Sequence, residues 1–205
     1  VALKQKPIII STGIAGFEDI KLAVETCRKV GNNDVTLLKC TSSYPAPIQE
    51  ANLVMMQQFA EDFNVKIGLS DHTLGMLVPI VATSLGATVI EKHFILDKSI
   101  GGPDASFSLD ENEFKEMVIA VRNAEKSLGK ISYQLTQKQE SGKAFSRSLY
   151  IAKDVVKGDL INEQNIRSVR PGFGLHPKYF KEILGKKFTR NLEKGESLSL
   201  DMVSK

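Results

Sequence analysis

The chain has 205 residues, of which 42% are hydrophobic and 25% are charged, a composition typical of a globular protein with one or two domains. Its longest apolar stretch, residues 76–90, is interrupted by Pro79 and Gly86 and is too short to span a bilayer, so no membrane partner is expected. The start at Val1 has no signal-peptide pattern, and Cys27 and Cys40 form no disulfide or metal framework. These features favour the cytoplasm.

Charge is distributed unevenly along the chain. Residues 1–142 contain 14 Lys and Arg against 17 Asp and Glu, whereas residues 143–205 contain 13 against 7. No nucleic-acid-binding motif accompanies the basic part, so nucleic acid is not an expected partner. A small anionic ligand, an acidic partner surface or an ordinary solvated surface explains the charge better.

Strand and helix patterns alternate over the first 128 residues. Short apolar runs predict strands at 7–11, 35–40, 66–70 and 88–91, and helical periodicity predicts helices at 17–30, 49–63, 76–85 and 111–128. Ser108-Leu-Asp-Glu111 has the spacing of a capping box for the last helix, which Gly129 is expected to end. Four consecutive βα units require a parallel sheet.

Polar residues follow the carboxyl end of every predicted strand: Ser11-Thr12, Thr41-Ser42, Ser70-Asp71-His72 and Glu91-Lys92-His93. TIM-barrel enzymes assemble their active sites at this edge of the sheet. Because eight βα units close such a barrel, we expect residues 1–129 to form the C-terminal half of a TIM barrel and the chain to be part of a longer protein.

Residues 130–145 lose helical periodicity and are predicted to be a linker. Residues 146–205 are expected to form a small β-rich domain, with a short helix near 178–184. Within it, the run Ala152–Ile161 is echoed by Thr189–Leu198, each turning at Lys-Gly followed by an acidic residue. This similarity indicates an internal pseudo-repeat.

His72 and His93 stand just beyond two neighbouring predicted strands. A single histidine at such a position is usually structural, but two at matched positions favour a divalent metal site. Two imidazoles leave coordination positions open for water or substrate, as a Lewis-acid metal requires. His176 is expected to be a loop residue.

Other polar residues are candidates for substrate binding. Ser11, Ser42 and Ser70 offer hydroxyl and backbone donors to a phosphate, although serines after strands are also ordinary helix caps. Asp104 lies where a carboxylate can bind a sugar hydroxyl, or it is a turn residue. Arg170 precedes a proline and is suited to gripping a polar substrate, unless it is a surface arginine.

Five motifs resemble the sialic acid synthase family in the same order. They are Ser11-Thr-Gly-Ile-Ala15, Leu38-Lys-Cys-Thr-Ser-Ser-Tyr-Pro45, Gly68-Leu-Ser-Asp-His-Thr73, Glu91-Lys-His-Phe94 and Ser168-Val-Arg-Pro-Gly-Phe-Gly174. Within this family, residues 145–150, 41–44 and 173–177 are most similar to the pseudaminic acid synthase branch. The resemblance implies a TIM-barrel synthase domain at 1–129 and an antifreeze-like SAF domain at 146–205.

The resemblance also implies a reaction and a set of roles. Phosphoenolpyruvate condenses with the open-chain aldehyde of an amino sugar, and phosphate leaves by C–O cleavage. His72 and His93 hold the metal, usually Mn²⁺, with Mg²⁺ and Co²⁺ as alternatives, and act in catalysis together with Asp104. The residues implied around phosphoenolpyruvate are Ser11, Ser42 and Ser70, and those toward the sugar are Tyr44, Asp104 and Arg170. Arg170 would reach the barrel of the other subunit in a domain-swapped homodimer.

Two departures from the family pattern bear on this assignment. The lysines and glutamate that the family supplies from its first barrel strands have no counterpart here, and Ser42 stands where sialic acid synthases commonly have Asn. The expected substrate is 2,4-diacetamido-2,4,6-trideoxy-β-L-altropyranose. The alternatives are an N-acetylneuraminate or legionaminate synthase, another metal-dependent barrel aldolase, or a non-catalytic sugar-binding or antifreeze-like protein.

Overall fold

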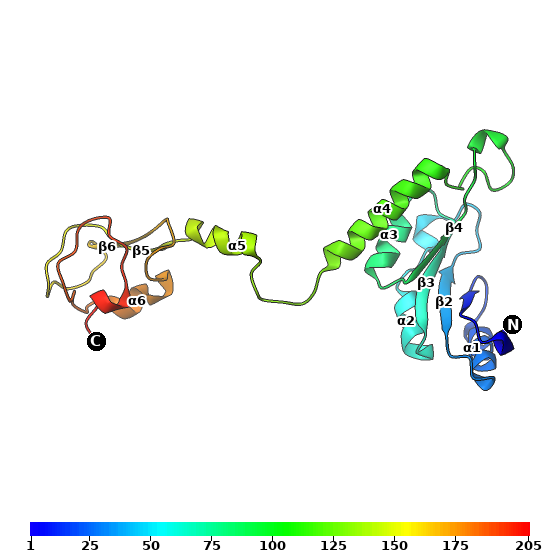
Figure 1. The fold of residues 1–205 in the computed structure, drawn as a ribbon, viewed down its shortest axis with the longest axis horizontal. Helices are drawn as coiled ribbons and strands as arrows, with labels where there is room; N and C mark the ends of the chain where they lie inside the picture. Colours follow the sequence, from blue (N-terminus) through cyan, green and yellow to red (C-terminus); the bar gives the residue numbers. More distant parts are fainter. The chain divides into compact units, whose positions relative to one another are not determined.

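The computed structural model describes residues 1–205, which divide into two compact units, Val1–Lys130 and Ile131–Lys205 (Figure 1). Each unit has its own cluster of buried hydrophobic side chains. A bilayer-crossing helix, which needs both length and a continuous apolar surface, is not found in either unit.

The first unit is built on a four-stranded parallel sheet with the strand order β1-β2-β3-β4. The strands are β1 (Ile8–Ser11), β2 (Val35–Cys40), β3 (Lys66–Asp71) and β4 (Val89–Lys92). Three helices connect them and one follows: α1 (Phe17–Lys29), α2 (Met55–Phe63), α3 (Leu77–Ser84) and α4 (Glu111–Leu128). The sheet is curled, as in half of a βα barrel, which agrees with the expected fold class at this level (Figure 1).

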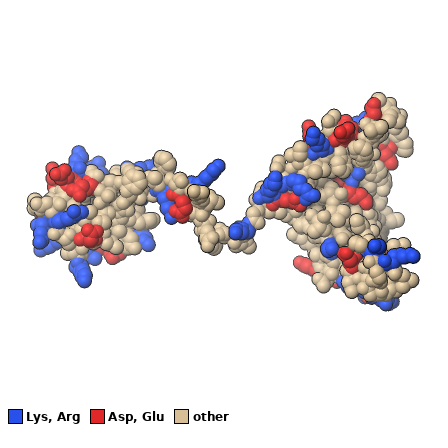
Figure 2. Space-filling model, viewed as in Figure 1, with Lys and Arg blue, Asp and Glu red and all other residues tan.

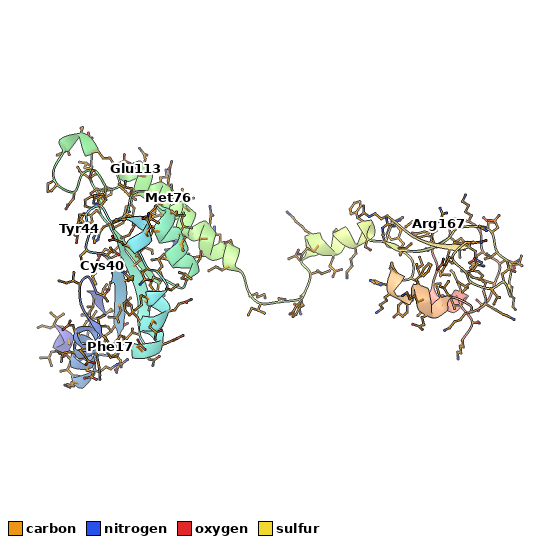
Figure 3. All side chains as sticks on the ribbon, turned by 180° about the vertical axis from the view of Figure 1, so that it is seen from behind. Phe17, Cys40, Tyr44, Met76, Glu113 and Arg167 are labelled. Carbon is orange, nitrogen blue, oxygen red and sulfur yellow. The ribbon has the colours of Figure 1, made fainter.

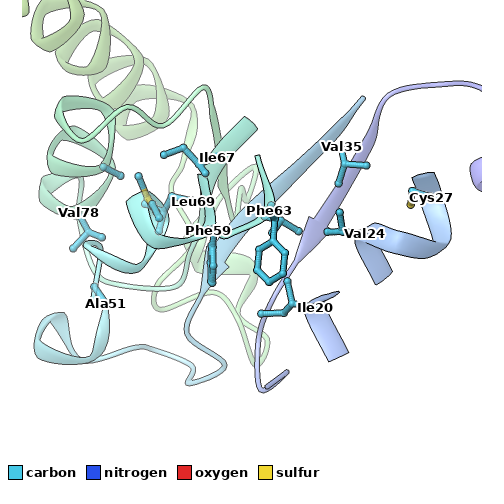
Figure 4. Close-up of a cluster of buried hydrophobic side chains, with 13 residues drawn as sticks. Ile20, Val24, Cys27, Val35, Ala51, Phe59, Phe63, Ile67, Leu69 and Val78 are labelled. Carbon is cyan, nitrogen blue, oxygen red and sulfur yellow. The ribbon is translucent and has the colours of Figure 1, made fainter. Parts of the chain in front are cut away.

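One face of the sheet packs against the helices because alternate strand residues point to opposite sides. Val35, Leu37, Ile67 and Leu69 belong to the buried cluster under the helices, shown in Figure 4. The helices contribute apolar side chains at helical spacing: Ile20, Val24, Cys27, Met56, Phe59, Phe63, Val78 and Ala82. Ala51, which lies before α2, joins the same cluster. The intervening strand residues, which include Leu38, therefore face the other side of the sheet.

The expected helix 49–63 is wrong over its first residues. The structure has a short 3-10 helix at Ile48–Glu50, and α2 starts only at Met55. Asn52 between them has φ = 42°, a left-handed conformation that an α-helix cannot include. The hydrophobic periodicity of the sequence continues through Asn52, but the helical backbone does not.

The expected cap of α4 is also wrong. Asp110, rather than Ser108, is the N-cap: its side chain accepts from the backbone N–H of Glu113, and the Glu113 side chain accepts from the backbone N–H of Asp110. Ser108 donates instead to the carbonyl of Asp104, at 2.7 Å. The helix itself spans the predicted residues, 111–128.

The second unit is rich in short β pairings. Its paired strands are β5 (Ser148–Ile151) and β6 (Ile166–Val169), which run antiparallel, and its helices are α5 (Gln137–Gly142) and α6 (Phe180–Ile183). The 3-10 helices are Lys143–Phe145, Pro177–Tyr179 and Leu200–Met202. Helix α5 lies in the stretch predicted to be a linker without helical structure, and Thr136 caps it by accepting from the N–H of Gln139.

The pseudo-repeat is a structural one. Val155 and Leu192, at equivalent positions of the two runs, exchange both of their backbone hydrogen bonds at 3.0 Å. The equivalent glycines, Gly158 and Gly195, both have φ = 95°. The two runs therefore pair with each other through Val155 and Leu192 about a local two-fold relation, and the turn glycines make equivalent bonds, Gly158 N–H to the Phe188 carbonyl and Gly195 N–H to the Ile151 carbonyl, each at 2.9 Å.

Charged side chains of both signs are mixed over the second unit. On the face drawn in Figure 2, its Lys and Arg side chains are spread around the unit, with Asp and Glu between them. The net positive charge of residues 143–205 therefore forms no uninterrupted basic stripe on that face.

Candidate active site

The ends of β3 and β4 bring the two candidate metal ligands together. Asp71 and Lys92 are register partners and the last residues of these strands, so His72 and His93 are the first residues beyond the ladder. The imidazole centroids are 5.1 Å apart, with the ring planes inclined by 73°. Both rings are thus presented at the carboxyl edge of the sheet.

Hydrogen bonds orient the ring of His72, which is buried. Its Nδ1 lies 2.8 Å from the carbonyl oxygen of Thr41, in the loop after β2. Because a carbonyl oxygen only accepts, Nδ1 carries the proton in the neutral ring, and Nε2 is then the nitrogen with the lone pair. The backbone carbonyl of His72 accepts from the N–H of Ala46 at 2.9 Å. The loop after β2 therefore fixes both the tautomer and the position of this histidine, as outer partners of metal ligands do.

The ring of His93 has a carboxylate as its neighbour. His93 Nδ1 is 3.6 Å from Asp104 Oδ2, longer than a hydrogen bond, and the side chains are 32% and 54% exposed. Asp104 comes from the loop between β4 and α4, which folds back because the backbone N–H of Leu109 donates to the carbonyl of His93 at 2.9 Å. Asp104 can therefore interact both with His93 and with a bound molecule.

Two aromatic rings complete the wall around the histidines. The ring of Tyr44, labelled in Figure 3, lies 4.3 Å from that of His72, and the ring of Phe107 lies 4.9 Å from that of His93. Tyr44 is 55% exposed, whereas Phe107 is 2% exposed. Tyr44 therefore faces solvent or a ligand, and Phe107 is a buried support that sequence reasoning missed. The sequence feature that could have indicated Phe107 is its position three residues after Asp104, in the loop that leads to the capped helix α4.

The three candidate serines occupy the ends of three adjacent strands. Ser11 and Ser42 are exposed, and a Cβ atom added to Gly13 would lie 3.1 Å from Ser42 Oγ, so the loops after β1 and β2 are adjacent. Ser70 is buried and donates to the Glu91 carboxylate at 2.6 Å. A phosphate-donor role for Ser70 therefore requires its hydroxyl to turn away from Glu91.

Lys39 supports the loop that orients His72. Its Nζ donates to the carbonyl of Cys40 at 3.1 Å and to Thr41 Oγ1 at 3.2 Å. Burial lowers the pKa of the Lys39 amine below its ordinary value, against a smaller opposing effect of Cys40.

Arg170 belongs to the second unit, where it is exposed directly after β6.

The donor set fits a metal that also binds substrate. No group of three or more His, Cys, Asp or Glu side chains is arranged to enclose a metal ion anywhere in the chain. Structural metal sites are closed by protein ligands, whereas catalytic sites keep positions open. Two neighbouring imidazoles, one with a free Nε2, match the second kind of site.

Comparison with known proteins shows to which family the chain belongs. Residues 1–133 match the NeuB family, and residues 146–204 match the SAF domain. The chain belongs to the NeuB family. This result confirms the resemblance to sialic acid synthases.

Relatives within the NeuB family match along the whole chain. Pseudaminic acid synthase of Helicobacter pylori is 49% identical over 205 residues, covering 100% of this chain and 60% of that protein. N,N'-diacetyllegionaminic acid synthase of Legionella pneumophila is 40% identical, covering 96% and 57%. The crystal structure of the spore coat polysaccharide biosynthesis protein SpsE of Bacillus subtilis has a TM-score of 0.61 at 32% identity, covering 100% and 63%. The chain thus spans about 60% of the length of its curated relatives.

Proposed function

We propose that this chain is part of a pseudaminic acid synthase. It would condense phosphoenolpyruvate with 2,4-diacetamido-2,4,6-trideoxy-β-L-altropyranose to give a nonulosonic acid and phosphate. The difference between 49% identity to a pseudaminic acid synthase and 40% to a legionaminic acid synthase supports this choice of sugar. Legionaminate synthesis is the second candidate. We also propose that the curled sheet is the C-terminal half of a TIM barrel in the complete enzyme.

The observation that carries the catalytic part is the pair of imidazoles 5.1 Å apart at the carboxyl edge of the sheet. His72 and His93 would hold a divalent cation there, Mn²⁺ with Mg²⁺ and Co²⁺ as alternatives, which would supply Lewis acidity toward the sugar aldehyde. Thr41 holds His72 in the tautomer whose Nε2 can act as a ligand. Tyr44 and Asp104 line the same edge, where a sugar ring and its hydroxyls would lie.

The reaction balances without a redox partner. C3 of phosphoenolpyruvate forms a bond to the aldehyde carbon, and the aldehyde oxygen takes one proton from the water that adds at C2. The hydroxyl formed at C2 then loses its proton as the bond between C2 and the phosphate oxygen breaks, which gives a ketone and hydrogen phosphate. We propose that Ser11, Ser42 and Ser70 bind the phosphate group during these steps. Donors that are already in place where charge develops stabilise the transition state without reorganisation.

The metal assignment is tested by His72→Ala and His93→Ala in the complete protein. Each variant is expected to lose bound metal and to reduce phosphate release at least ~100-fold, because removing a ligand should cost no less than removing a hydrogen-bond partner of a ligand, which costs about 10- to 100-fold. The control is His176→Ala, because His176 serves locally by accepting from the N–H of Lys178. Full activity with unchanged metal content in either of the first two variants would contradict the assignment.

The choice of sugar is tested by assaying both branches side by side. The proposed substrate, 2,4-diacetamido-2,4,6-trideoxy-β-L-altropyranose, is expected to give the higher kcat/KM, with N-acetylmannosamine the poorer substrate. A preference for N-acetylmannosamine would assign the protein to the neuraminate branch. Absence of condensation with any sugar in the complete, metal-loaded protein would favour a non-catalytic sugar-binding role.

We propose further that the enzyme acts in the cytoplasm as a domain-swapped homodimer in which Arg170 serves the partner's site. The two free, buried cysteines support a reducing compartment. Mixing His72→Ala subunits with Arg170→Ala subunits should restore part of the activity, because one site of a mixed dimer has both residues intact. If subunits exchange and the mixture stays inactive, Arg170 does not act across the dimer.

A further inference from the structure

A buried ion pair lies directly before the two histidines. Lys92 Nζ is 2.6 Å from Asp71 Oδ2, and the two side chains are 0% and 2% exposed. Asp71 and Lys92 are register partners and the last residues of β3 and β4. Beyond them, no backbone pairing between these strands holds His72 at a set distance from His93.

The same pair also forms hydrogen bonds with Thr73, the residue after His72. Asp71 accepts from the backbone N–H of Thr73 at 3.0 Å and from Thr73 Oγ1 at 3.1 Å. Lys92 donates to the carbonyl of Thr73 as well as to Asp71. His72 therefore lies between two residues that are anchored to one lysine of the neighbouring strand, and that lysine immediately precedes His93.

We infer that Asp71 and Lys92 are positioning residues that set the separation and orientation of the His72 and His93 imidazoles. This inference rests on the metal-binding role proposed for the two histidines. The charges are fully enclosed, so substrate does not touch them, and their effect must pass through the strand ends. Two apolar side chains in their place would fill the space without a directional link between the strands.

A second ion pair in the same sheet provides a matched control. Asp34 and Lys66 join the start of β3 to the residue before β2, with Lys66 Nζ 2.9 Å from Asp34 Oδ1 and exposures of 62% for Lys66 and 45% for Asp34. This pair has the same residue types and charges at the opposite end of the strands, and it is exposed to solvent where the first pair is buried. Its removal by Asp34→Asn with Lys66→Met changes the charge count as the test variant does, but far from the histidines.

The test variant is Asp71→Asn with Lys92→Met in the complete protein, because removing both charges avoids leaving one of them buried alone. We expect affinity for Mn²⁺, measured by calorimetry, to fall about 10- to 100-fold, the range for partners of metal ligands. In the metal-free protein, imidazole ¹⁵N spectra should show that His72 no longer holds a single Nδ1-protonated form. The control variant should retain both properties.

Unchanged Mn²⁺ affinity and an unchanged His72 spectrum in the folded double variant would overturn the inference. Loss of the folded state in the double variant would also overturn it, because the pair would then support the whole sheet. His72→Ala in the same titration tests the proposed function separately. If that variant binds Mn²⁺ normally, the metal assignment fails, whereas the metal-free spectrum still decides the role of the ion pair.

Discussion

Gly68 occupies a position in β3 where a side chain has no room. A Cβ atom there would lie 2.5 Å from Leu38 Cδ2, 2.5 Å from the carbonyl oxygen of Val89 and 3.1 Å from Val89 Cβ. Leu38 is fully buried, and the Val89 carbonyl belongs to the strand paired with Gly68. Carbon atoms in contact are normally ~3.5–4.0 Å apart, so the Leu38 side chain would have to move. The Val89 carbonyl is backbone of the paired strand, so relieving that contact requires the strands to shift.

Gly68→Ala is therefore expected to lower the free energy of unfolding. Overpacking a core costs about 1–3 kcal/mol, and we expect the upper half of that range because one clashing atom is backbone. For a cooperative folding unit of roughly 150–250 residues, a loss of about 2–3 kcal/mol lowers Tm by roughly 4–12 °C. The strand that must shift carries Ser70 and His72 at its end, so catalytic efficiency should fall as well.

Thermal and urea unfolding of the complete protein would measure the effect. Gly142→Ala is the control, because a Cβ atom at Gly142 meets nothing within 4 Å and its φ is helical. That substitution should change stability by less than about 0.5 kcal/mol or increase it slightly. If Gly68→Ala were as stable as wild type, the close packing of β2, β3 and β4 described here would be wrong.

Three further predictions concern helix capping, turn conformation and pH. Asp110→Ala should lower the free energy of unfolding by about 1 kcal/mol, and Ser108→Ala by less; the reverse order in urea unfolding would contradict the assigned cap. Gly158→Ala and Gly195→Ala should each cost about 1–3 kcal/mol, since both have φ = 95°; a large difference between them would contradict the local two-fold relation. The pKa of Glu113 is held below its ordinary value of 4.5, chiefly by a hydrogen bond from a lysine. The ionised Glu113 therefore stabilises the folded state above its ordinary pKa, and this stabilisation is lost as the pH falls through its lowered pKa in the folded protein. Glu113→Gln should consequently make the free energy of unfolding depend less on pH in the acid range. An identical acid dependence in the variant would refute this role.

Periodic patterns located the regular elements well where nothing interrupts them. The strand at 35–40 and the helix at 111–128 have the predicted bounds, because their apolar residues recur at the period of the structure they form. The start of α2 was missed because Asn52 adopts φ = 42°, which no hydrophobic pattern reveals. For α4, Ser108 and Asp110 each precede a glutamate by three residues, so spacing alone could not choose the cap.

Helix α5 shows a different limit of the sequence pattern. Its six residues are too few to display helical periodicity, and its stretch is rich in polar residues typical of a linker. The capping pair of Thr136 and Gln139 was the available signal. Short helices depend on such end contacts more than on an apolar face.

The sequence by itself determined that the two histidines reach the candidate site. His72 and His93 had to meet at one edge, because consecutive parallel strands present their carboxyl ends together. Only the tertiary structure decided what surrounds them: the Thr41 carbonyl on His72, Phe107 beside His93, and the salt bridge of Asp71 with Lys92. These contacts depend on strand register and loop paths, which are set by packing between distant segments rather than by local pattern.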